Sequence, residues 1–273
     1  MNPLTGFHVT VRGASHIRHN ADCQDYSKSA CFGSAAAAAV ADGHGDVRYF
    51  RSGTGARFAV EAALKSVREF VKRENSETLK NADEKFDQLK KNIILNWNRK
   101  VVRHYSSHPF SSEELEPLSE RRRSFLEGGK LIESAYGTTL IVSAVGADYW
   151  FGMQLGDGDC FAFNRDGTVS SVPREDSLVG NVTTSLCESD AFYHFHHIYC
   201  AGSPAAVIMS TDGVKNSFSS FSCYRDFMEK IVSEFSSSPC QTTKKNLMEF
   251  LSEMTEKGSG DDLSVAGVLN SAY

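Results

Sequence analysis

Acidic turns that recur beside apolar, strand-like segments constrain the fold of this chain more than any other feature of its sequence. The first is Val40-Ala41-Asp42-Gly43-His44-Gly45, which follows an alanine-rich run. Further carboxylates stand at comparable junctions, namely Asp25, Asp157, Asp212 and Asp261, the last with Asp262 beside it. Asp-Gly is a common turn dipeptide, so each turn alone predicts only a reversal of the chain. The spacing of the five junctions leaves open whether their carboxylates form one site.

Hydrophobic periodicity predicts a chain that mixes strands with amphipathic helices. Residues 7–11 alternate apolar and polar side chains, which is the period of a half-buried strand. Further strands are predicted for 138–142, 149–155, 160–163, 193–199, 205–209 and 263–269. Helices are predicted for 52–72, 81–105, 224–233 and 243–256, where apolar residues recur at helical spacing.

The run from Ser29 to Ala41 is ambiguous. Five consecutive alanines, Ala35 to Ala39, have the highest helix propensity of any residue type, so propensity alone predicts a helix. The glycine-containing turn that follows is instead typical of a strand end.

Composition narrows the classes of function. A net charge of -5 and a pI near 6.0 disfavour a nucleic-acid or anionic-membrane partner. The densest basic run, Arg121-Arg122-Arg123, has four glutamates close to it in the sequence and is interpreted as a solvated face. The seven cysteines are odd in number and form no Cys-x-x-Cys pair, which favours a reducing compartment. No signal-peptide pattern opens the sequence and no run of about 18 apolar residues occurs, so a cytoplasmic protein is expected.

Carboxylates at strand ends are suited to hard divalent cations. Mg²⁺ and Mn²⁺ take oxygen ligands and keep several waters, so a few carboxylates suffice to hold them. Two such ions can share one hydroxide and present it to phosphorus.

Six short motifs, in order along nearly the whole chain, resemble those of the metal-dependent Ser/Thr protein phosphatases of type 2C, the PPM family, in its bacterial branch. They are Cys23-Gln24-Asp25, Val40 to Gly45, Tyr136-Gly137-Thr138-Thr139-Leu140, Leu155-Gly156-Asp157, Met209-Ser210-Thr211-Asp212-Gly213 and Gly260-Asp261-Asp262-Leu263-Ser264-Val265.

The resemblance implies an α+β fold: a four-layer αββα sandwich in which helices flank two central antiparallel sheets. It implies that 34–41 is a strand, against the propensity prediction. With no internal repeat or low-complexity linker, one domain is expected over 1–273, with a charged helical segment at about 73–130 and a variable flap at about 170–200. His194, His196 and His197 fall in that flap, where a strand with alternating faces is preferred over a transition-metal site.

The resemblance also implies roles for single residues. Asp42 would bridge two metals, and Gly43 would add its backbone carbonyl. Asp212 and Asp261 would bind the second metal, with Asp262 standing where many members carry Asn. Asp25 would act through water, and Asp157 would help to hold a third, weaker ion. His44 would be the general acid, a role that an ordinary histidine pKa near 6.5 suits.

Two positions depart from the family pattern. Gln24 replaces a common Glu, and Asn20 stands where many members place the arginine that grips phosphate. Candidates for that grip are Arg18, His16, Arg12 and Arg48, because a guanidinium binds phosphate bidentately.

The function implied is hydrolysis of phosphoserine and phosphothreonine by a hydroxide bridging two Mn²⁺ or Mg²⁺ ions, with a third ion where Asp157 contributes. Phosphorylated proteins would be the substrates, a Ser/Thr kinase the opposing enzyme, and the protein a monomer. The alternative motivated by Gln24 and Asn20 is a catalytically weak, phosphoprotein-binding regulatory module.

Overall fold

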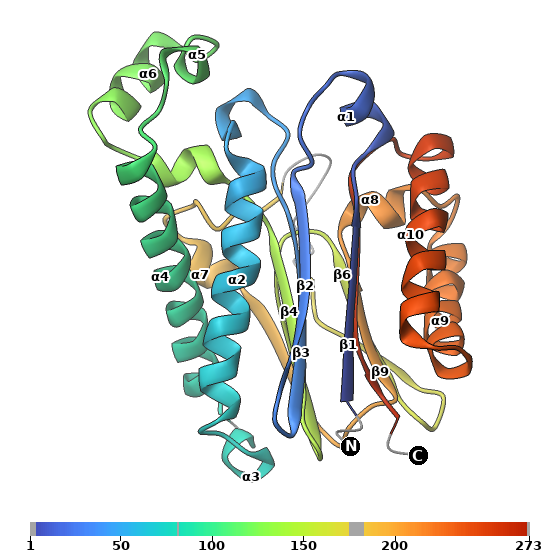
Figure 1. Ribbon diagram of the computed structural model, residues 1–273. Helices are drawn as coiled ribbons and strands as arrows, with labels where there is room; N and C mark the ends of the chain where they lie inside the picture. The colour runs from blue at the N-terminus through green and yellow to red at the C-terminus, as the bar shows by residue number, and fades with distance from the viewer. Residues whose placement is uncertain (1–3, 81, 175–182, 272–273) are drawn as a thin grey trace.

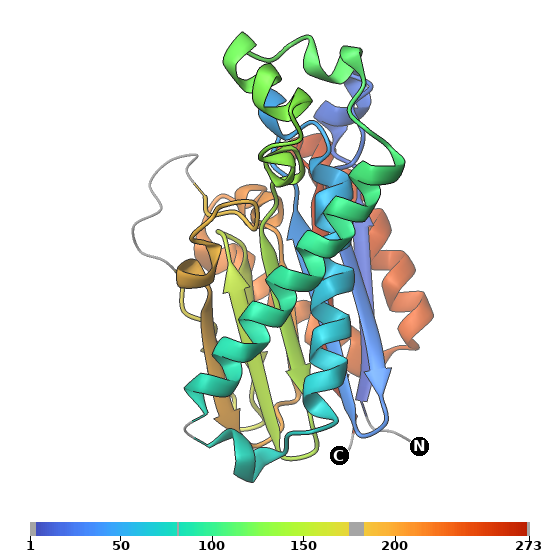
Figure 2. The same ribbon diagram turned by 90° about the vertical axis from the view of Figure 1, so that its left-hand side faces the viewer.

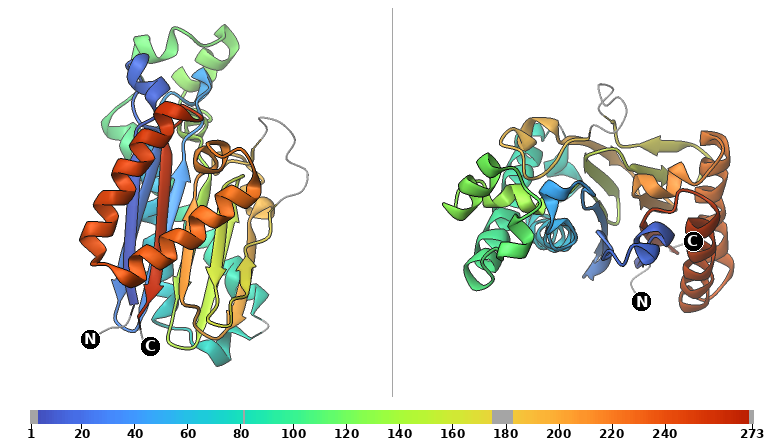
Figure 3. Two further views of the ribbon diagram at one scale, coloured as in Figure 1. Left: turned by 90° about the vertical axis from the view of Figure 1, so that its right-hand side faces the viewer. Right: turned by 90° about the horizontal axis from the view of Figure 1, so that it is seen from above.

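The chain folds into two five-stranded sheets packed face to face, with helices covering both outer faces (Figures 1 and 3). The computed structural model describes residues 4–80, 82–174 and 183–271. Every strand pairing within the two sheets is antiparallel. The predicted α+β sandwich is therefore confirmed.

The first sheet joins the two ends of the chain. Its order is β1 (Leu4–Val11), β10 (Leu263–Asn270), β9 (Ala206–Ser210), β6 (Asp159–Phe163) and β7 (Val169–Ser171). The second sheet has the order β2 (Asp25–Phe32), β3 (Ala35–Asp42), β4 (Leu140–Val145), β5 (Tyr149–Leu155) and β8 (His196–Ala201).

Long amphipathic helices form the outer layers. The β2–β8 sheet is covered by α2 (Ser52–Val71) and α4 (Asp83–Ser107), and the other by α9 (Phe221–Ser237) and α10 (Cys240–Lys257). These four agree with the predicted helices, apart from their ends. Short helices fill the connections: α1 (Ala14–Arg18), α3 (Ser76–Leu79), α5 (Ser112–Leu115), α6 (Glu120–Glu127), α7 (Ala191–His194) and α8 (Asp212–Asn216), with 3-10 turns η1 (Val47–Tyr49) and η2 (Ile132–Tyr136). In the part of the chain that the structure describes, no helix is both long and apolar enough to cross a bilayer.

The alanine run forms the central strand β3, so the helix predicted from propensity is wrong and the strand implied by the resemblance is confirmed. Its side chains are buried on both faces. Ala36, Ala38 and Val40 pack between the sheets, whereas Ala37, Ala39 and Ala41 face the α2 and α4 layer. Ladders to β2 and β4 satisfy its backbone on both edges. Packing and pairing on four sides therefore override the intrinsic preference of alanine.

The strand predicted over 193–199 is partly wrong, because Tyr193 and His194 belong to α7 and strand β8 begins at His196. His197 stacks on the Phe86 ring, with 4.7 Å between centroids, and its Nε2 lies 3.2 Å from the Asp83 carboxylate. This histidine therefore ties β8 to α4. Residues 175–182 of the predicted flap lie outside the described residues.

Helices α5 and α6 lie above one end of the sandwich, at the end where α1 also lies (Figures 1 and 2). Arg51, just before α2, holds α5 to the core. Its guanidinium donates to both carboxylate oxygens of Glu114 at 2.7 and 2.8 Å, and to the Tyr136 hydroxyl at 2.9 Å. Much of the charged 73–130 segment is thus ordered helix, with part of its charge engaged in the fold.

Candidate active site

The acidic turns converge at one end of the sandwich because antiparallel strands bring their ends together there. Strands β3, β5 and β9 end at or just before Asp42, Asp157 and Asp212, and β10 starts just after Asp261. These four aspartates line one cavity of about 930 Å³, together with Gly43 and His44. Motifs far apart in the sequence therefore meet in a single place.

Mutual repulsion marks this cluster as an anionic cavity. Burial raises the pKa of Asp42 well above its ordinary value, and the nearby carboxylates of Asp25, Asp212 and Asp261 raise it further. The Asp157 pKa is raised by burial and then by the Asp212 charge. Carboxylates crowded in this way are costly to keep ionised without a compensating cation.

Asp25 lies behind the cavity rather than in its wall. It is the cross-strand partner of Asp42, is buried, and does not line the cavity. Its Oδ2 accepts a hydrogen bond from the Thr211 hydroxyl at 2.8 Å, whereas its Oδ1 has no protein partner within the described residues. A buried carboxylate oxygen without a partner is expected to bind water or a cation.

Neighbouring aspartates 261 and 262 have different roles. Asp261 is exposed at the cavity. Asp262 is 3% exposed and accepts backbone N–H bonds from Gly13 and Gln24, both at 2.6 Å. The His16 Nδ1 lies 2.9 Å from its Oδ2. Asp261 is therefore available at the cavity, whereas the carboxylate of Asp262 is engaged within the fold.

The turn after β3 is held by main-chain contacts that a larger residue would break. A Cβ on Gly43 would lie 2.7 Å from the Ser52 carbonyl carbon and 2.8 Å from the Gln24 carbonyl oxygen. The Asp42 N–H donates to the Thr139 hydroxyl at 3.0 Å, and the Asp42 carbonyl accepts from the Thr138 hydroxyl at 2.8 Å. These threonines position the start of the acidic turn.

His44 lies beside the aspartates in a tightly packed wall. Its ring contacts the Tyr49 ring edge to face at 4.8 Å, and a Cβ on Gly137 would reach within 3.0 Å of both rings. Burial lowers the pKa of His44 to about 4, against a smaller opposing effect of Asp157. The expectation of an ordinary histidine pKa is therefore wrong for the metal-free protein, in which the imidazole is neutral at pH 7.

The potential metal ligands at this cavity are oxygen atoms that lie close together, and some of them have no hydrogen-bond partner. Such a set fits hard divalent cations. Asp42, Asp212 and Asp261 supply carboxylates, and the bare Gly43 backbone lies beside them in the cavity wall. Softer metals prefer cysteine and histidine ligands. The described lining residues include no cysteine and two histidines, His16 and His44.

Sequence comparison decides the family, since residues 12–252 match the profile described as protein phosphatase 2C. The chain belongs to the protein phosphatase 2C family. It is accordingly a phosphoprotein phosphatase. A comparison with curated protein sequences found no match.

Solved bacterial phosphatases share the 2C fold of this chain. The Staphylococcus aureus Ser/Thr phosphatase Stp1 is 13% identical, with a TM-score of 0.60 over 97% of this chain and 94% of its own. The catalytic domain of PstP, solved with two manganese ions, is 14% identical, with a TM-score of 0.56 and 97% of each chain covered. Another bacterial serine phosphatase is 13% identical, with a TM-score of 0.59 over 98% of each chain.

One of the two departures from the 2C pattern, Asn20, has a structural explanation. Asn20 adopts a left-handed backbone, with φ of 54°, two residues after the end of α1. Asparagine tolerates this conformation better than arginine does, so a turn occupies the position of the expected phosphate ligand. Gln24 lines the cavity, while its backbone N–H is held by Asp262 and its carbonyl accepts from the Gly43 N–H at 3.1 Å.

Of the four phosphate-binding candidates, two line the cavity. His16 and Arg48 are among its lining residues, whereas Arg12 and Arg18 are not. Arg12 instead donates to the carbonyl oxygens of Ala21 and His16, at 2.7 and 3.4 Å, and so fastens the α1 loop. Arg48 is exposed and bonds to the Asp46 carboxylate at 2.8 Å.

Lys215 is a cation at this site that the sequence reasoning missed. It lines the cavity one turn after Asp212 on α8, donates to the Asp157 carbonyl oxygen at 3.3 Å, and lies 3.9 Å from the buried Asp159 carboxylate. Asp159 also pairs with Arg174 at 2.8 Å. The i, i+3 spacing from Asp212 was the available signal, but α8 is too short to be recognised from periodicity.

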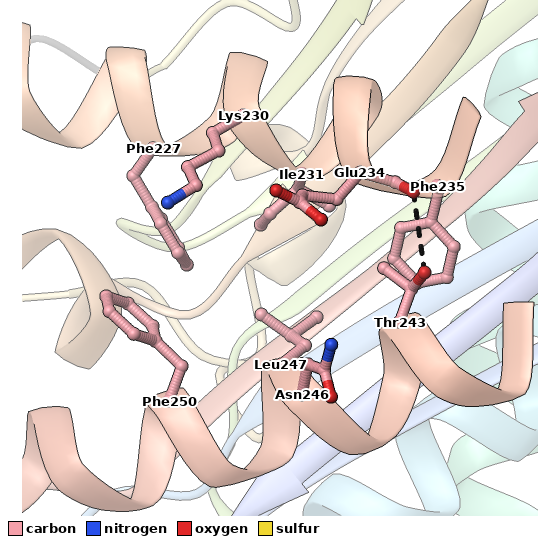
Figure 4. A pocket seen from close by; sticks show the side chains of 9 residues that line it. All are labelled: Phe227, Lys230, Ile231, Glu234, Phe235, Thr243, Asn246, Leu247 and Phe250. Atoms are coloured by element: carbon pink, nitrogen blue, oxygen red, sulfur yellow. Dashed lines mark hydrogen bonds between the residues drawn. The ribbon is translucent and has the colours of Figure 1, made fainter. Parts of the chain in front are cut away.

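A second hollow lies between α9 and α10, on the outer layer away from the acidic turns (Figures 1 and 4). Phe227 and Phe250 stack across it with 5.2 Å between centroids, and the Thr243 hydroxyl donates to the Glu234 carbonyl oxygen at 3.4 Å. Its lining is mainly apolar and provides one carboxylate, so it does not resemble a phosphate or metal site.

Proposed function

We propose that this chain is a phosphatase specific for phosphoserine and phosphothreonine in proteins, using two Mn²⁺ or Mg²⁺ ions, with a third where Asp157 contributes. The observation that carries the proposal is the meeting of Asp42, Asp157, Asp212 and Asp261 in one cavity, with Asp25 behind it. Divalent cations at such a site supply an activated water at neutral pH and neutralise charge on the phosphate. The two manganese ions in the PstP complex support the choice of metal and number.

The residues divide into three tasks under this proposal. Asp42, the Gly43 carbonyl, Asp212 and Asp261 hold the cations, with Asp25 acting from behind Asp42 through water. His44 supplies a hydrogen bond to the leaving serine or threonine oxygen, and then a proton once the negative charge of the bound phosphate has raised its pKa from the low value of the metal-free protein. Lys215 and Arg48 provide the positive charge that the phosphate meets where arginine is lacking at position 20, and His16 also lines the cavity.

The proposal extends to the setting of the enzyme. Residues 1–273 form one phosphatase domain that works as a cytoplasmic monomer and opposes a Ser/Thr kinase. In support, all seven cysteines lie among the described residues and are unpaired, as a reducing compartment requires.

An assay with an aryl phosphate tests the proposal. Purified protein is expected to hydrolyse it only with Mn²⁺ or Mg²⁺, and to lose activity on chelation. Undiminished activity in both Asp42→Ala and Asp212→Ala would remove the assigned site. If the protein with excess Mn²⁺ bound a phosphopeptide but turned over neither substrate, the regulatory alternative would replace this proposal.

Replacing His44 by asparagine is expected to affect substrates according to their leaving group. Loss of a general acid should lower kcat on the order of a hundredfold for a phosphoserine peptide, whose alkoxide leaving group needs a proton. An aryl phosphate needs little protonation, so its kcat should fall less than about tenfold. Equal losses on both substrates, measured at saturating Mn²⁺, would argue against the acid role.

Replacing Lys215 by methionine is expected to weaken phosphate binding while the metal ligands stay in place. The kcat/KM for an aryl phosphate should fall roughly tenfold, and inhibition by inorganic phosphate should weaken in parallel, because a cation facing the phosphate is lost. Lys230→Met on α9, away from the site, is the matched control. Unchanged phosphate inhibition in Lys215→Met would show that its charge serves only the fold.

A further inference from the structure

A groove beside the active site is formed by the segment that contains α6. It has a volume of about 310 Å³, and its lining includes Arg48, Arg121, Arg122, Phe125, Leu131 and Ser134. Arg48 lines both this groove and the catalytic cavity, so the two adjoin. Helix α6 stands at the end of the sandwich where the acidic turns gather (Figures 1 and 2).

The groove is cationic because its arginines are only partly neutralised. Arg122 donates weakly to the carbonyl oxygens of Arg48 and Ser134, at 3.4 and 3.3 Å, and its buried Nε has no partner within the described residues. The Arg121 guanidinium lies over the Phe125 ring, 6.0 Å from its centroid. Among the described side chains, Asp46 is the one carboxylate that pairs with these arginines, through Arg48.

The interpretation of Arg121 to Arg123 as one solvated face is therefore wrong in part. Arg123 serves the fold, since it donates to the carbonyl oxygens of Leu115, Glu116 and Leu118. Glu114, one of the nearby glutamates, is engaged by Arg51. Arg121 and Arg122 remain directed to the groove, next to the exposed apolar side chains of Phe125 and Leu131, which are 38% and 64% exposed.

We propose that this groove binds an acidic segment of the substrate protein, next to its phosphorylated serine or threonine. The inference rests on the proposed function and specifies its substrate class. The arginines would face the acidic side chains, and Phe125 and Leu131 would contact their apolar neighbours. A chain of net charge -5 otherwise repels acidic peptides, so a local cationic groove beside the catalytic cavity favours them at this place.

A nucleic acid fits the groove less well. Binding of a phosphate backbone uses many basic contacts along an extended track. Here three arginines line the groove together with the apolar side chains of Phe125 and Leu131, and one of the arginines, Arg48, is already paired with Asp46. A short peptide with a few carboxylates matches both the charge and the apolar surface.

The test uses three substrates. Two are phosphoserine peptides of equal length, one with glutamates and one with uncharged residues beside the phosphoserine, and the third is an aryl phosphate. Arg121→Glu is the principal variant because its side chain is exposed, and Arg122→Gln is the second. Arg225→Glu, on α9 in the opposite outer layer, makes the same change of charge and is the control. Binding of the unphosphorylated acidic peptide, measured by fluorescence anisotropy without divalent metal, provides a readout independent of turnover.

In Arg121→Glu, kcat/KM for the acidic peptide should fall about three- to tenfold, and the loss should shrink at high salt, as expected for exposed charges. In the same variant, kcat/KM for the uncharged peptide and for the aryl phosphate should be unchanged, and anisotropy should show weaker binding of the acidic peptide. The control Arg225→Glu should have wild-type kcat/KM for all three substrates. Equal kcat/KM losses on both peptides, unchanged binding, or tighter binding of an RNA oligonucleotide of equal charge would overturn the groove assignment. Wild-type protein that hydrolyses no substrate would overturn the proposed function, while the anisotropy result would still decide the groove.

Discussion

Asp42→Asn is expected to lower kcat for an aryl phosphate on the order of 10³-fold or more, because the carboxylate at the centre of the acidic cavity is lost. Without metal, the Asp42→Asn protein should be at least as stable as the wild type. The native state raises the pKa of Asp42 through burial and the charges of Asp25, Asp212 and Asp261. A carboxyl whose pKa is raised on folding destabilises the native state. This cost is complete above the folded pKa, shrinks as the pH falls below that value, and is gone below the unfolded pKa.

Thermal unfolding distinguishes this account from a purely structural role of Asp42. Without metal at pH 7, the Tm of Asp42→Asn should equal or exceed that of the wild type, by about 2–4 °C for each kcal/mol relieved. Addition of Mn²⁺ should raise the wild-type Tm and have a smaller effect on the variant. Asp226→Asn, an exposed carboxylate on α9, controls for the change in net charge. A metal-free Asp42→Asn protein that melts well below the wild type would contradict the idea of mutual repulsion.

Asp262→Ala is expected to have the largest effect on stability, lowering the free energy of unfolding by about 3–5 kcal/mol. Its buried carboxylate accepts the backbone N–H groups of Gly13 and Gln24 and lies beside His16. These partners come from the ends of β1 and of the α1 loop, so one side chain ties β10 to both. Alanine would leave the buried N–H of Gly13 and the partly buried N–H of Gln24 without an acceptor.

The neighbouring Asp261 is the matched control for this prediction. Asp261→Ala removes a side chain at the cavity that accepts one backbone N–H, from Asp262 at 2.9 Å. Asp261→Ala should lower the free energy of unfolding, measured in urea, by no more than about 1 kcal/mol, while phosphatase activity is largely lost. If both substitutions lowered stability alike, the division of the pair into a ligand and an anchor would be wrong.

The sequence predicted the parts of this structure that depend on local pattern and failed where distant contacts decide. Four long helices followed from their apolar stripes, and the acidic turns marked the strand ends that meet in the cavity. Strand β3 could not be predicted from its own residues, because its conformation depends on β2, β4, α2 and the opposite sheet.

The candidate site shows the same division between local and distant effects. Motif order located the aspartates and His44, but the burial that lowers the His44 pKa arises from packing against Tyr49 and Gly137. Lys215 escaped notice because α8 has five residues, too few for a visible period. The basic groove exists because the α6 segment packs next to Arg48. The charges of Arg121 and Arg122 in the sequence do not reveal this packing.

Calorimetric titration of Mn²⁺ into metal-free protein tests the central claim most directly, because it measures the proposed metal centre without relying on turnover. The wild type is expected to bind two ions per chain, as PstP does in its manganese complex. Asp212→Asn should lose one ion or bind it at least about tenfold more weakly, since one carboxylate ligand becomes neutral. A wild-type protein that takes up no Mn²⁺, or an Asp212→Asn variant with the same stoichiometry and affinity, would contradict the assignment of these aspartates as metal ligands.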